Sequence, residues 1–214
     1  MITIGLTGSI GMGKSMAAAM FQDYGVPVFD SDKCVRRLLS ADEKAIREVV
    51  AHFPDCWDLK KREIDRRILA DIVFRDPEEK ERLETILHPY VWTAQEKFSR
   101  EMQRLRKQAI VLDIPLLFET GAEYRVDTTV VVTAPPYIQY QRVMSRPDMT
   151  EEKFFSILEG QMPDEDKRRL ADFVVPTGIG FAETRKHIIR ILHDLVYQEV
   201  GPANNEFSDP KQSV

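Results

Sequence analysis

Short apolar runs recur along the chain, and none shows strict alternation of polar and apolar residues. Runs of this kind, rich in Val and Ile, are typical of strands buried on both faces, as in a parallel sheet covered by helices. They are ITIGL (2–6), VPVF (26–29), AIVLD (109–113), TTVVVT (128–133) and DFVV (172–175). The pattern therefore predicts the strands of one parallel sheet.

Segments with a charged face and an apolar face separate these runs and predict helices. They are 14–23, 31–40, 43–52, 62–74, 78–86, 90–107, 136–146, 151–160 and 181–198. The alternation predicts an α/β domain over residues 1–200 with helices on both faces of the sheet. From about 34 to 107 we find no convincing strand, so we predict a helical insert there. Residues 201–214, rich in Gly, Pro, Asn and Ser, are predicted to be a disordered tail.

Composition narrows the class of protein. Of 214 residues, 43% are apolar and 30% charged, as in an ordinary soluble globular protein, and no apolar stretch approaches the ~20 residues of a membrane span. A formal net charge of −5 argues against a general nucleic-acid binder. Cys34 and Cys56 form no CxxC motif, and no secretory segment is seen. We therefore expect a cytoplasmic protein without a nucleic-acid or membrane partner; the sequence carries no signal of an oligomeric state.

The stretch GSIGMGKS (8–15) follows the first strand and opens the first helix. It matches the phosphate-binding loop (P-loop) pattern G-x-x-x-x-G-K-[ST], in which backbone N–H groups surround phosphate oxygens and the lysine reaches the β and γ phosphates. A glycine-rich turn with a surface lysine is the alternative, but the position before a helix N-terminus favours an anion site. Lys14 is therefore predicted to contact the nucleotide phosphates, and Ser15 to hold Mg²⁺.

Carboxylates end two other strands. Asp30 and Asp32 in FDSD (29–32) are placed for a base that orients a hydroxyl nucleophile. The alternative is that Asp30 or Ser31 only caps the following helix, and capping can coexist with the functional role. Asp113 ends the third strand, where it could bind Mg²⁺ through water or simply begin a loop. The carboxyl ends of parallel strands share one edge of a sheet, so we expect these groups near the P-loop.

Two arginines, Arg142 and Arg146, stand four residues apart in QYQRVMSR (139–146), on one face of the predicted helix. Beside a charged helical hairpin, they suit a lid at about 147–170 that covers triphosphate charge during transfer. We expect the other charges of 151–169 to be solvated surface.

Together these motifs resemble the dephospho-coenzyme A kinase family, over roughly residues 2–198. IGLTGSIGMGKS is similar to the family's I-G-L-T-G-G-I-G-S-G-K-S, and DIPLLFE (113–119) to its D-V-P-L-L-F-E. FDSD, LHP (87–89), QYQRVMSR and GQMP (160–163) fit its other motifs. The resemblance implies a P-loop kinase fold, ATP and Mg²⁺ as cofactors, and phosphorylation of the ribose 3′-hydroxyl of dephospho-coenzyme A.

The resemblance also implies roles for single residues. Catalytic roles fall to Lys14, Arg142, Arg146 and Asp32, the last as the base for the hydroxyl. The nucleotide would be bound by the P-loop and its neighbours, that is Thr7, Gly8, Gly11, Met12, Gly13, Lys14, Ser15 and Met16, with Ser15 and Asp113 as metal ligands. The acceptor pocket and lid would include Asp30, His88, Pro115, Leu116, Leu117, Phe118, Glu119 and Gln161. Judged alone, His88 before Pro89 could simply end a helix, and PLLF could be core.

The chain departs from the family pattern at several positions. Ser9 replaces the second glycine and Met12 the serine of the P-loop, which is tolerable because the backbone binds the phosphates. Thr177 stands where the family has asparagine, so the motif does not assign the adenine contacts, and backbone groups are the alternative. Pro147 in RPDM (146–149) bears on how far the lid arginine can swing.

Two other functions compete with this interpretation. A switch-type GTPase would use the same loop, but it should carry N-K-x-D and D-x-x-G segments, and neither is found. Another small-molecule kinase, acting on a nucleoside monophosphate or shikimate, is the nearer competitor. PLLFE and the long helical insert argue against it.

Overall fold

The computed structural model describes residues 1–197, which divide into two compact units. The first unit is Met1–Phe29 together with the chain from Met102 onward, and the second is Asp30–Glu101. The predicted tail at 201–214 and the end of the last predicted helix at residue 198 lie outside the described residues.

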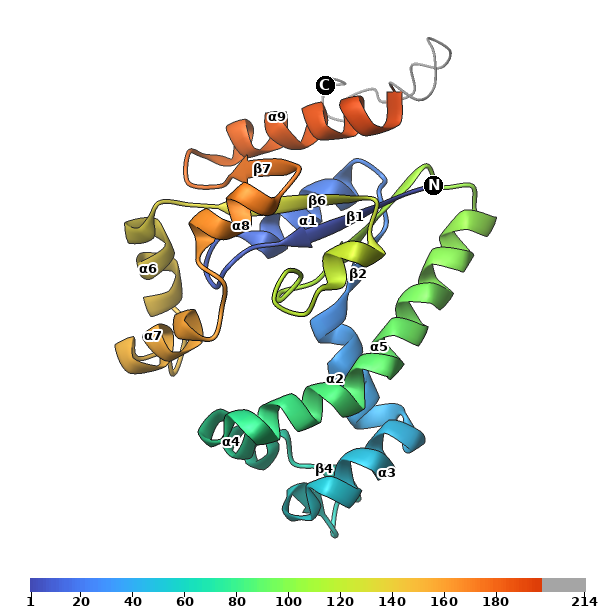
Figure 1. The fold of residues 1–214 in the computed structure, drawn as a ribbon, viewed down its shortest axis with the longest axis vertical. Coiled ribbons are helices and arrows are strands. Elements are labelled where there is room, and N and C mark those ends of the chain that lie inside the picture. The colour runs from blue at the N-terminus through green and yellow to red at the C-terminus, as the bar shows by residue number, and fades with distance from the viewer. Residues whose placement is uncertain (198–214) are drawn as a thin grey trace, which may run out of the picture. The chain divides into compact units, whose positions relative to one another are not determined.

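The first unit is built on a five-stranded sheet with the order β2-β5-β1-β6-β7. Figure 1 labels β1, β2, β6 and β7 of this sheet. The strands are β1 (Ile2–Thr7), β2 (Val28–Asp30), β5 (Ala109–Asp113), β6 (Thr128–Thr133) and β7 (Phe173–Pro176). β1 pairs in parallel with β5 and β6, and β6 pairs in parallel with β7. The predicted parallel α/β sheet is thus confirmed, and each observed strand begins within two residues of its prediction.

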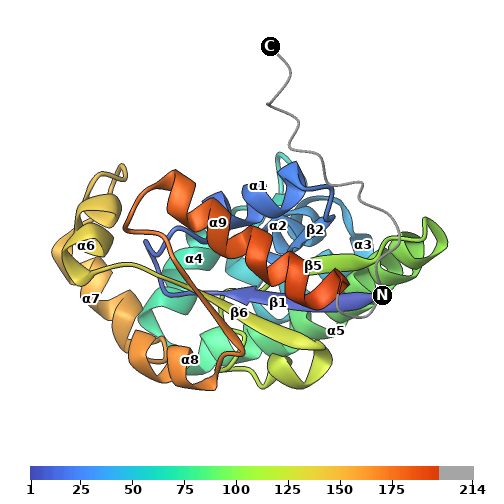
Figure 2. The same ribbon diagram turned by 90° about the horizontal axis from the view of Figure 1, so that it is seen from above.

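Helices cover both faces of this sheet (Figure 2). On one face lie α1 (Lys14–Asp23) and α9 (Phe181–Leu192), which continues as the π-helical turn η3 (His193–Tyr197). On the other face lie α8 (Asp164–Leu170) and the segment after β5, which includes the 3-10 turn η2 (Ala122–Arg125). Helices α6 (Pro136–Met144) and α7 (Glu151–Glu159) follow β6.

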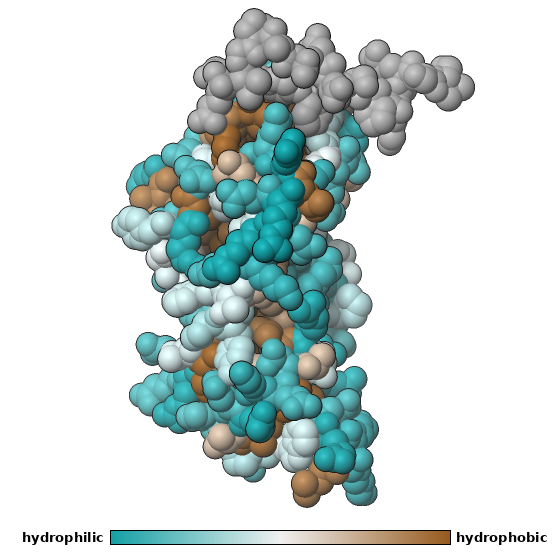
Figure 3. Space-filling view, turned by 90° about the vertical axis from the view of Figure 1, so that its right-hand side faces the viewer, coloured by the Kyte–Doolittle hydropathy of each residue, from teal (hydrophilic) through white to brown (hydrophobic). Residues whose placement is uncertain are grey.

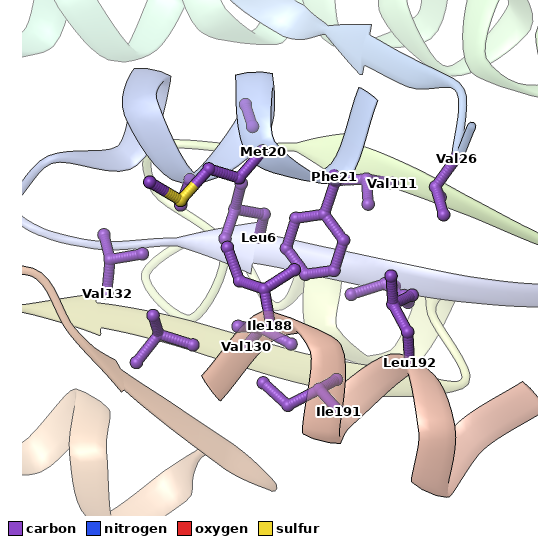
Figure 4. Close-up of a cluster of buried hydrophobic side chains, with 14 of the residues drawn as sticks. Leu6, Met20, Phe21, Val26, Val111, Val130, Val132, Ile188, Ile191 and Leu192 are labelled. Carbon is purple, nitrogen blue, oxygen red and sulfur yellow. The ribbon is translucent and has the colours of Figure 1, made fainter. Parts of the chain in front are cut away.

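The strand side chains explain the apolar runs. Val130 and Val132 belong to the cluster under α1 and α9, whereas Val131 between them packs with Leu117 and Phe118 on the opposite face. Figure 4 shows the first cluster, where the Phe21 ring from α1 lies among side chains of the strands and of α9. Phe21 is fully buried, and burial of such side chains is the main stabilising contribution to the unit.

The second unit has its own core. Its elements are α2 (Ser31–Ala41), α3 (Glu43–His52), the 3-10 turn η1 (Pro54–Cys56), β3 (Trp57–Asp58), β4 (Glu63–Ile64), α4 (Arg66–Arg75) and most of α5 (Pro77–Arg104). Val49 and Cys56 are fully buried at its centre. The expectation of no strand here was wrong, because β3 and β4, of two residues each, form a short antiparallel hairpin. Helix α4 begins only at Arg66, since Asp65 caps it by accepting from the N–H groups of Arg67 and Ile68.

Pro89 does not end a helix. The predicted helices 78–86 and 90–107 are a single helix, α5, of 28 residues with Pro89 inside it. Proline has no N–H to donate to the carbonyl of the preceding turn, which usually breaks or kinks a helix. Here Leu87 and Val91, on either side of the proline, are buried, so packing holds the helix together.

Two boundaries in the first unit also differ from the prediction. Helix α8 was not predicted, and α6 ends at Met144 rather than at residue 146. The second difference has a local cause, because Pro147 disfavours helical backbone at the residue before it.

Hydrophilic residues occupy most of the face drawn in Figure 3, and apolar residues appear there in small separate areas. None of the helices in residues 1–197 is both long enough and apolar enough to cross a membrane.

Candidate nucleotide and phosphoryl-transfer site

The carboxyl ends of the first unit's strands carry the candidate site. The P-loop follows β1, Asp113 ends β5, and Thr177 follows β7. The chain passes from β1 to β2 on one side of the sheet and later places β6 on the other side of β1. The carboxyl end of β1 is therefore a topological switch point, where open α/β sheets bind their ligands.

The glycines of the P-loop are required by its shape. Gly11 has φ +78° and Gly13 φ +87°, a conformation that other residues rarely adopt. A Cβ atom on Gly8 would lie 2.4 Å from Val132 Cγ2 and 2.8 Å from its carbonyl oxygen. Gly13 is the N-cap of α1 and offers no side-chain cap. The uncapped helix N-terminus and the loop before it thus fit an anion such as a phosphate.

Lys14 forms an ion pair with Asp113 Oδ1. The side chains are 17% and 8% exposed, respectively. Lys14 begins α1 and Asp113 ends β5, so the pair joins the P-loop to the neighbouring strand. In such a partly buried place the attraction between the charges is stronger than at an open surface. An ammonium and a carboxylate therefore face each other where the sequence predicts phosphate and Mg²⁺.

Other residues of the predicted nucleotide site have mixed surroundings. Thr7 is buried, and its hydroxyl donates to the carbonyl of Pro115 at 2.9 Å. Ser15, the predicted metal ligand, is exposed in the first turn of α1. Met16 packs against the core of the first unit. Met12 is buried, and its sulfur accepts from the N–H of Ala134 at 3.0 Å, so this departure from the family pattern is anchored to the end of β6.

Two glutamines hold the peptide group of Ile10 in the P-loop. Gln161 Oε1 accepts from the Ile10 N–H at 3.0 Å, and Gln139 Nε2 donates to the Ile10 carbonyl at 2.8 Å. Gln161 was predicted as a lid residue, and the structure brings it to the P-loop. Gln139 was not predicted as a site residue; its only sequence signal is its place in the motif QYQRVMSR.

Arg142 donates to protein acceptors. Its Nη2 lies 2.8 Å from the carbonyl oxygen of Thr177, and its Nη1 lies 3.0 Å from Thr177 Oγ1 and 3.4 Å from the carbonyl oxygen of Gly11. The guanidinium thus connects α6, the end of β7 and the P-loop. Sequence reasoning expected this arginine at the site but gave it no protein partner.

Thr177 forms hydrogen bonds at the site that the sequence did not indicate. It is 2% exposed, and its hydroxyl donates to the carbonyl of Met12 at 2.6 Å. Its N–H donates to the carbonyl of Thr133 at 2.8 Å. The asparagine position of the family is therefore filled here by a side chain turned toward the P-loop backbone.

Arg146 lies two residues beyond the end of α6 and is exposed. The expectation that it shares a helical face with Arg142 was wrong, because the helix ends before it. Within residues 1–197, no hydrogen bond or ion pair of its guanidinium is found. Its predicted role toward the phosphates stays a prediction.

The segment PLLFE has two kinds of environment. Leu117 and Phe118 are buried in the cluster on the second face of the sheet, whereas Pro115 and Leu116 are half-buried. Glu119 Oε1 pairs with Lys167 Nζ at 2.8 Å and accepts from the N–H of Met162 at 2.8 Å. The acceptor-binding role of these residues stays a prediction.

Three predicted site residues belong to the second unit. Asp30 is the N-cap of α2, and its side chain accepts from the N–H of Lys33 at 2.8 Å. Asp32 is exposed in the first turn of the same helix. His88 lies within α5 and stacks on Trp92 with ring centroids 5.9 Å apart. The capping alternative thus holds for Asp30, and the roles of Asp32 and His88 toward an acceptor stay predictions.

Known proteins share this fold and these motifs. A family model described as dephospho-CoA kinase matches residues 2–183. A dephospho-CoA kinase of Agrobacterium fabrum is 49% identical over 195 residues, which are 91% of this chain and 98% of that protein. One of Mesorhizobium japonicum is 48% identical over 91% of this chain and 97% of its own length.

Two solved structures agree with the fold. A crystal structure from Thermus thermophilus is 36% identical, with a TM-score of 0.78 over 92% of this chain and 98% of that one. A dephospho-CoA kinase from Campylobacter jejuni is 25% identical, with a TM-score of 0.66 over 92% of this chain and 98% of that one. Because the family model spans most of its length, the chain belongs to the dephospho-CoA kinase family.

Proposed function

We propose that this protein transfers the γ-phosphoryl group of ATP to the ribose 3′-hydroxyl of dephospho-coenzyme A, giving coenzyme A and ADP. The observation that carries the proposal is the P-loop at the carboxyl end of β1, closed by the Lys14–Asp113 pair, in a chain of the dephospho-CoA kinase family. We place the reaction in coenzyme A biosynthesis and in the cytoplasm. We expect neither a nucleic-acid nor a membrane partner.

The residues at the P-loop fit a nucleoside triphosphate with Mg²⁺. A Cβ atom at Gly8 would collide with Val132, so the backbone approaches closely where a side chain would otherwise stand. Mg²⁺ in phosphoryl-transfer sites takes few protein oxygens and several phosphate oxygens. Ser15 and Asp113 are the residues proposed to hold it, and the ion would neutralise charge on the β and γ phosphates.

Lys14 is proposed to exchange Asp113 for phosphate oxygens when ATP binds. Its ammonium would then stabilise the negative charge that develops on the leaving phosphate during transfer. The loop around the phosphates would be shaped by Gly11, Met12, Gly13 and Met16. Thr7, directly before the loop, would support it through its hydrogen bond to Pro115. Arg142, held beside the loop by Thr177 and Gly11, is proposed to contact the nucleotide.

Asp32 is proposed as the base. Its carboxylate would accept the proton of the 3′-hydroxyl as the oxygen attacks the γ-phosphorus, and the bond to the β-phosphate oxygen would break to release ADP. Arg146, on the exposed segment after α6, is proposed to join the phosphates when the lid of about 147–170 closes. The helical insert of about 34–107, with Asp30 and His88, and the segment Pro115–Glu119 are proposed to form the acceptor side.

An acceptor panel tests the proposal. The protein is incubated with MgATP and, separately, dephospho-coenzyme A, nucleoside monophosphates and shikimate, and ADP formation is followed. We expect ADP only with dephospho-coenzyme A, and a product phosphorylated at the 3′-oxygen by mass spectrometry and NMR. Dephospho-coenzyme A that lacks the 3′-hydroxyl is the matched control and should give no ADP above background. Faster turnover with another acceptor would refute the assignment.

A further inference from the structure

Lys167 is fully buried, unlike its neighbours on α8. It is the one lysine with 0% exposure among residues 1–197, whereas Arg168 and Arg169 beside it are exposed. Its Nζ lies 2.8 Å from Glu119 Oε1 and 3.5 Å from the carbonyl oxygen of Pro115. A buried ammonium is tolerated only when it is paired and hydrogen-bonded, so this position is built around the charge. The phosphoryl-transfer mechanism does not use it.

The partner carboxylate joins three segments of the chain. Glu119 Oε1 accepts from Lys167 Nζ in α8 and from the backbone N–H of Met162, which precedes α8, both at 2.8 Å. Glu119 itself follows β5. A charged acceptor forms stronger hydrogen bonds than a neutral one, so this oxygen fixes the backbone at Met162.

The residue before Met162 contacts the P-loop. Gln161 Oε1 accepts from the Ile10 N–H at 3.0 Å, and the Ile10 carbonyl accepts from Gln139 at 2.8 Å. Because residues 161 and 162 are adjacent, a carboxylate that holds the Met162 backbone also sets where the Gln161 amide lies. The Ile10 peptide group therefore depends on a contact made outside the loop.

A second connection supports the same loop. The carbonyl of Pro115 accepts from the Thr7 hydroxyl at 2.9 Å and lies within 3.5 Å of Lys167 Nζ. Thr7 is the last residue of β1, directly before the P-loop. Glu119 and Lys167 thus connect to both the start of the loop and its third residue.

We propose that Glu119 and Lys167 are positioning residues, which act through Met162 and Gln161 to hold the P-loop backbone in its phosphate-binding shape. The proposal rests on the proposed function only in that the P-loop binds ATP. Since the loop is on the nucleotide side, loss of the connection should weaken ATP binding and raise the KM for ATP. A purely structural pair would instead change stability alone.

Two double variants separate charge from hydrogen bonding. E119Q/K167M and E119L/K167M both remove the buried pair without leaving a lone charge, but only the first keeps an acceptor for the Met162 N–H. We expect E119L/K167M to weaken MgATP binding by about tenfold in isothermal titration calorimetry and E119Q/K167M by less than about threefold. Equal affinities for the two variants, or wild-type affinity for E119L/K167M, would overturn the proposal.

The connection is also tested from its other end. Q161A removes the contact to Ile10 directly, so it should weaken ATP binding about as much as E119L/K167M, and the combined variant should be no weaker than either, as expected for one shared connection. No loss in Q161A would contradict the proposal even if E119L/K167M failed to fold, and additive losses in the folded combined variant would contradict it as well.

The control removes an exposed pair from the same helix. In E165Q/R169M the lost pair has side chains 64% and 69% exposed, and ATP binding should stay at the wild-type value. Calorimetry is done without acceptor, so this test is independent of which acceptor the protein phosphorylates. If the acceptor panel refuted dephospho-coenzyme A as the substrate, the effect on ATP would still decide the inference.

Discussion

The Thr177 hydroxyl donates to the carbonyl oxygen of Met12 at 2.6 Å and accepts from Arg142 Nη1 at 3.0 Å. Both capacities of this buried group are thus used on protein partners, one of them in the P-loop backbone. Because its single proton is donated to Met12, the hydroxyl has no donor left for a nucleotide base. The loop conformation and the position of Arg142 therefore depend on one side chain after β7.

Replacing Thr177 by valine keeps the shape and removes the hydroxyl. The Met12 carbonyl and the Arg142 guanidinium would each lose a buried partner, which costs roughly 1–3 kcal/mol. We expect T177V to lower the free energy of unfolding in urea by about that amount and to weaken ATP binding. T177S keeps the hydroxyl and should restore ATP affinity. Wild-type stability in T177V would show that these hydrogen bonds contribute nothing net.

Lys14→Ala should abolish phosphoryl transfer. The barrier should rise by several kcal/mol, because electrostatic stabilisation carries most of this reaction. The circular dichroism spectrum should be unchanged, but the thermal midpoint should fall, since the Asp113 carboxylate loses the ammonium beside it. K186A, which removes a lysine from an exposed pair with Glu183, is the control. It should leave the turnover and the thermal midpoint unchanged. Near-normal turnover in folded K14A would refute the phosphate role.

The two arginines should behave differently. Arg142 makes three hydrogen bonds to the protein, so R142A should lower both stability and ATP affinity. Arg146 is exposed, so R146A should change stability by less than about 0.5 kcal/mol. If Arg146 contacts the phosphates only during transfer, R146A should lower kcat far more than it raises the KM for the acceptor. An effect on the acceptor KM alone would make Arg146 a binding residue.

Substitutions of Asp30 and Asp32 should also have different effects. Asp30 caps α2, so D30A should cost roughly 0.5–2 kcal/mol of stability. Asp32 is exposed, and D32N keeps the shape but cannot accept a proton as a base does. D32N should therefore have the stability and ATP affinity of the wild type and a kcat lower by about 10² to 10⁴. A fully active D32N protein would remove the base assignment, and loss of activity only in D30N would move the base to Asp30.

Asp172 should make stability depend on pH in the acid range. Burial raises the pKa of its carboxyl, but hydrogen bonds from the Thr129 N–H and hydroxyl and from the Thr128 hydroxyl outweigh burial and lower it. A lowered folded pKa gives stability that is present above the unfolded value of about 3.9 and is lost as the pH falls through the folded value.

The comparison with D172N shows this contribution. The wild type should be more stable than D172N at pH 7, and the difference should shrink when urea unfolding is repeated below about pH 4. T129V, which removes the hydroxyl but keeps the N–H donor, should reduce the difference only in part. A difference that is the same at both pH values would show that the Asp172 charge is not stabilised by folding.

The sequence predicted the sheet well because its strands are buried on both faces and so read as continuous apolar runs. It missed α8, whose sequence DEDKRRL has Leu170 as its one apolar residue and so gives no amphipathic pattern. It predicted two helices, 78–86 and 90–107, in place of α5. The cost of Pro89 can be read from the sequence, whereas the packing of Leu87 and Val91 that offsets it cannot.

For the candidate site, the sequence predicted the motif residues but not the residues that hold them in place. The P-loop glycines and Lys14 form a contiguous pattern. Thr177, Gln139 and Lys167 are single polar residues, and their partners at Met12, Ile10 and Glu119 lie far away along the chain. Such pairs come together only in the folded chain, so no local sequence pattern predicts them.

The central place of β1 bears on how the chain is made. Ile2 pairs with Ala109 and Ile4 with Thr128, so β1 has both of its neighbours only after β5 and β6 have been synthesised. At about 5–20 residues per second, β1 waits roughly 5–20 s for its first partner. The second unit, which has its own core, is fully synthesised during that interval. The P-loop approaches Val132 closely and is hydrogen-bonded to Thr177, so it cannot take its final shape until the chain has been synthesised past residue 177.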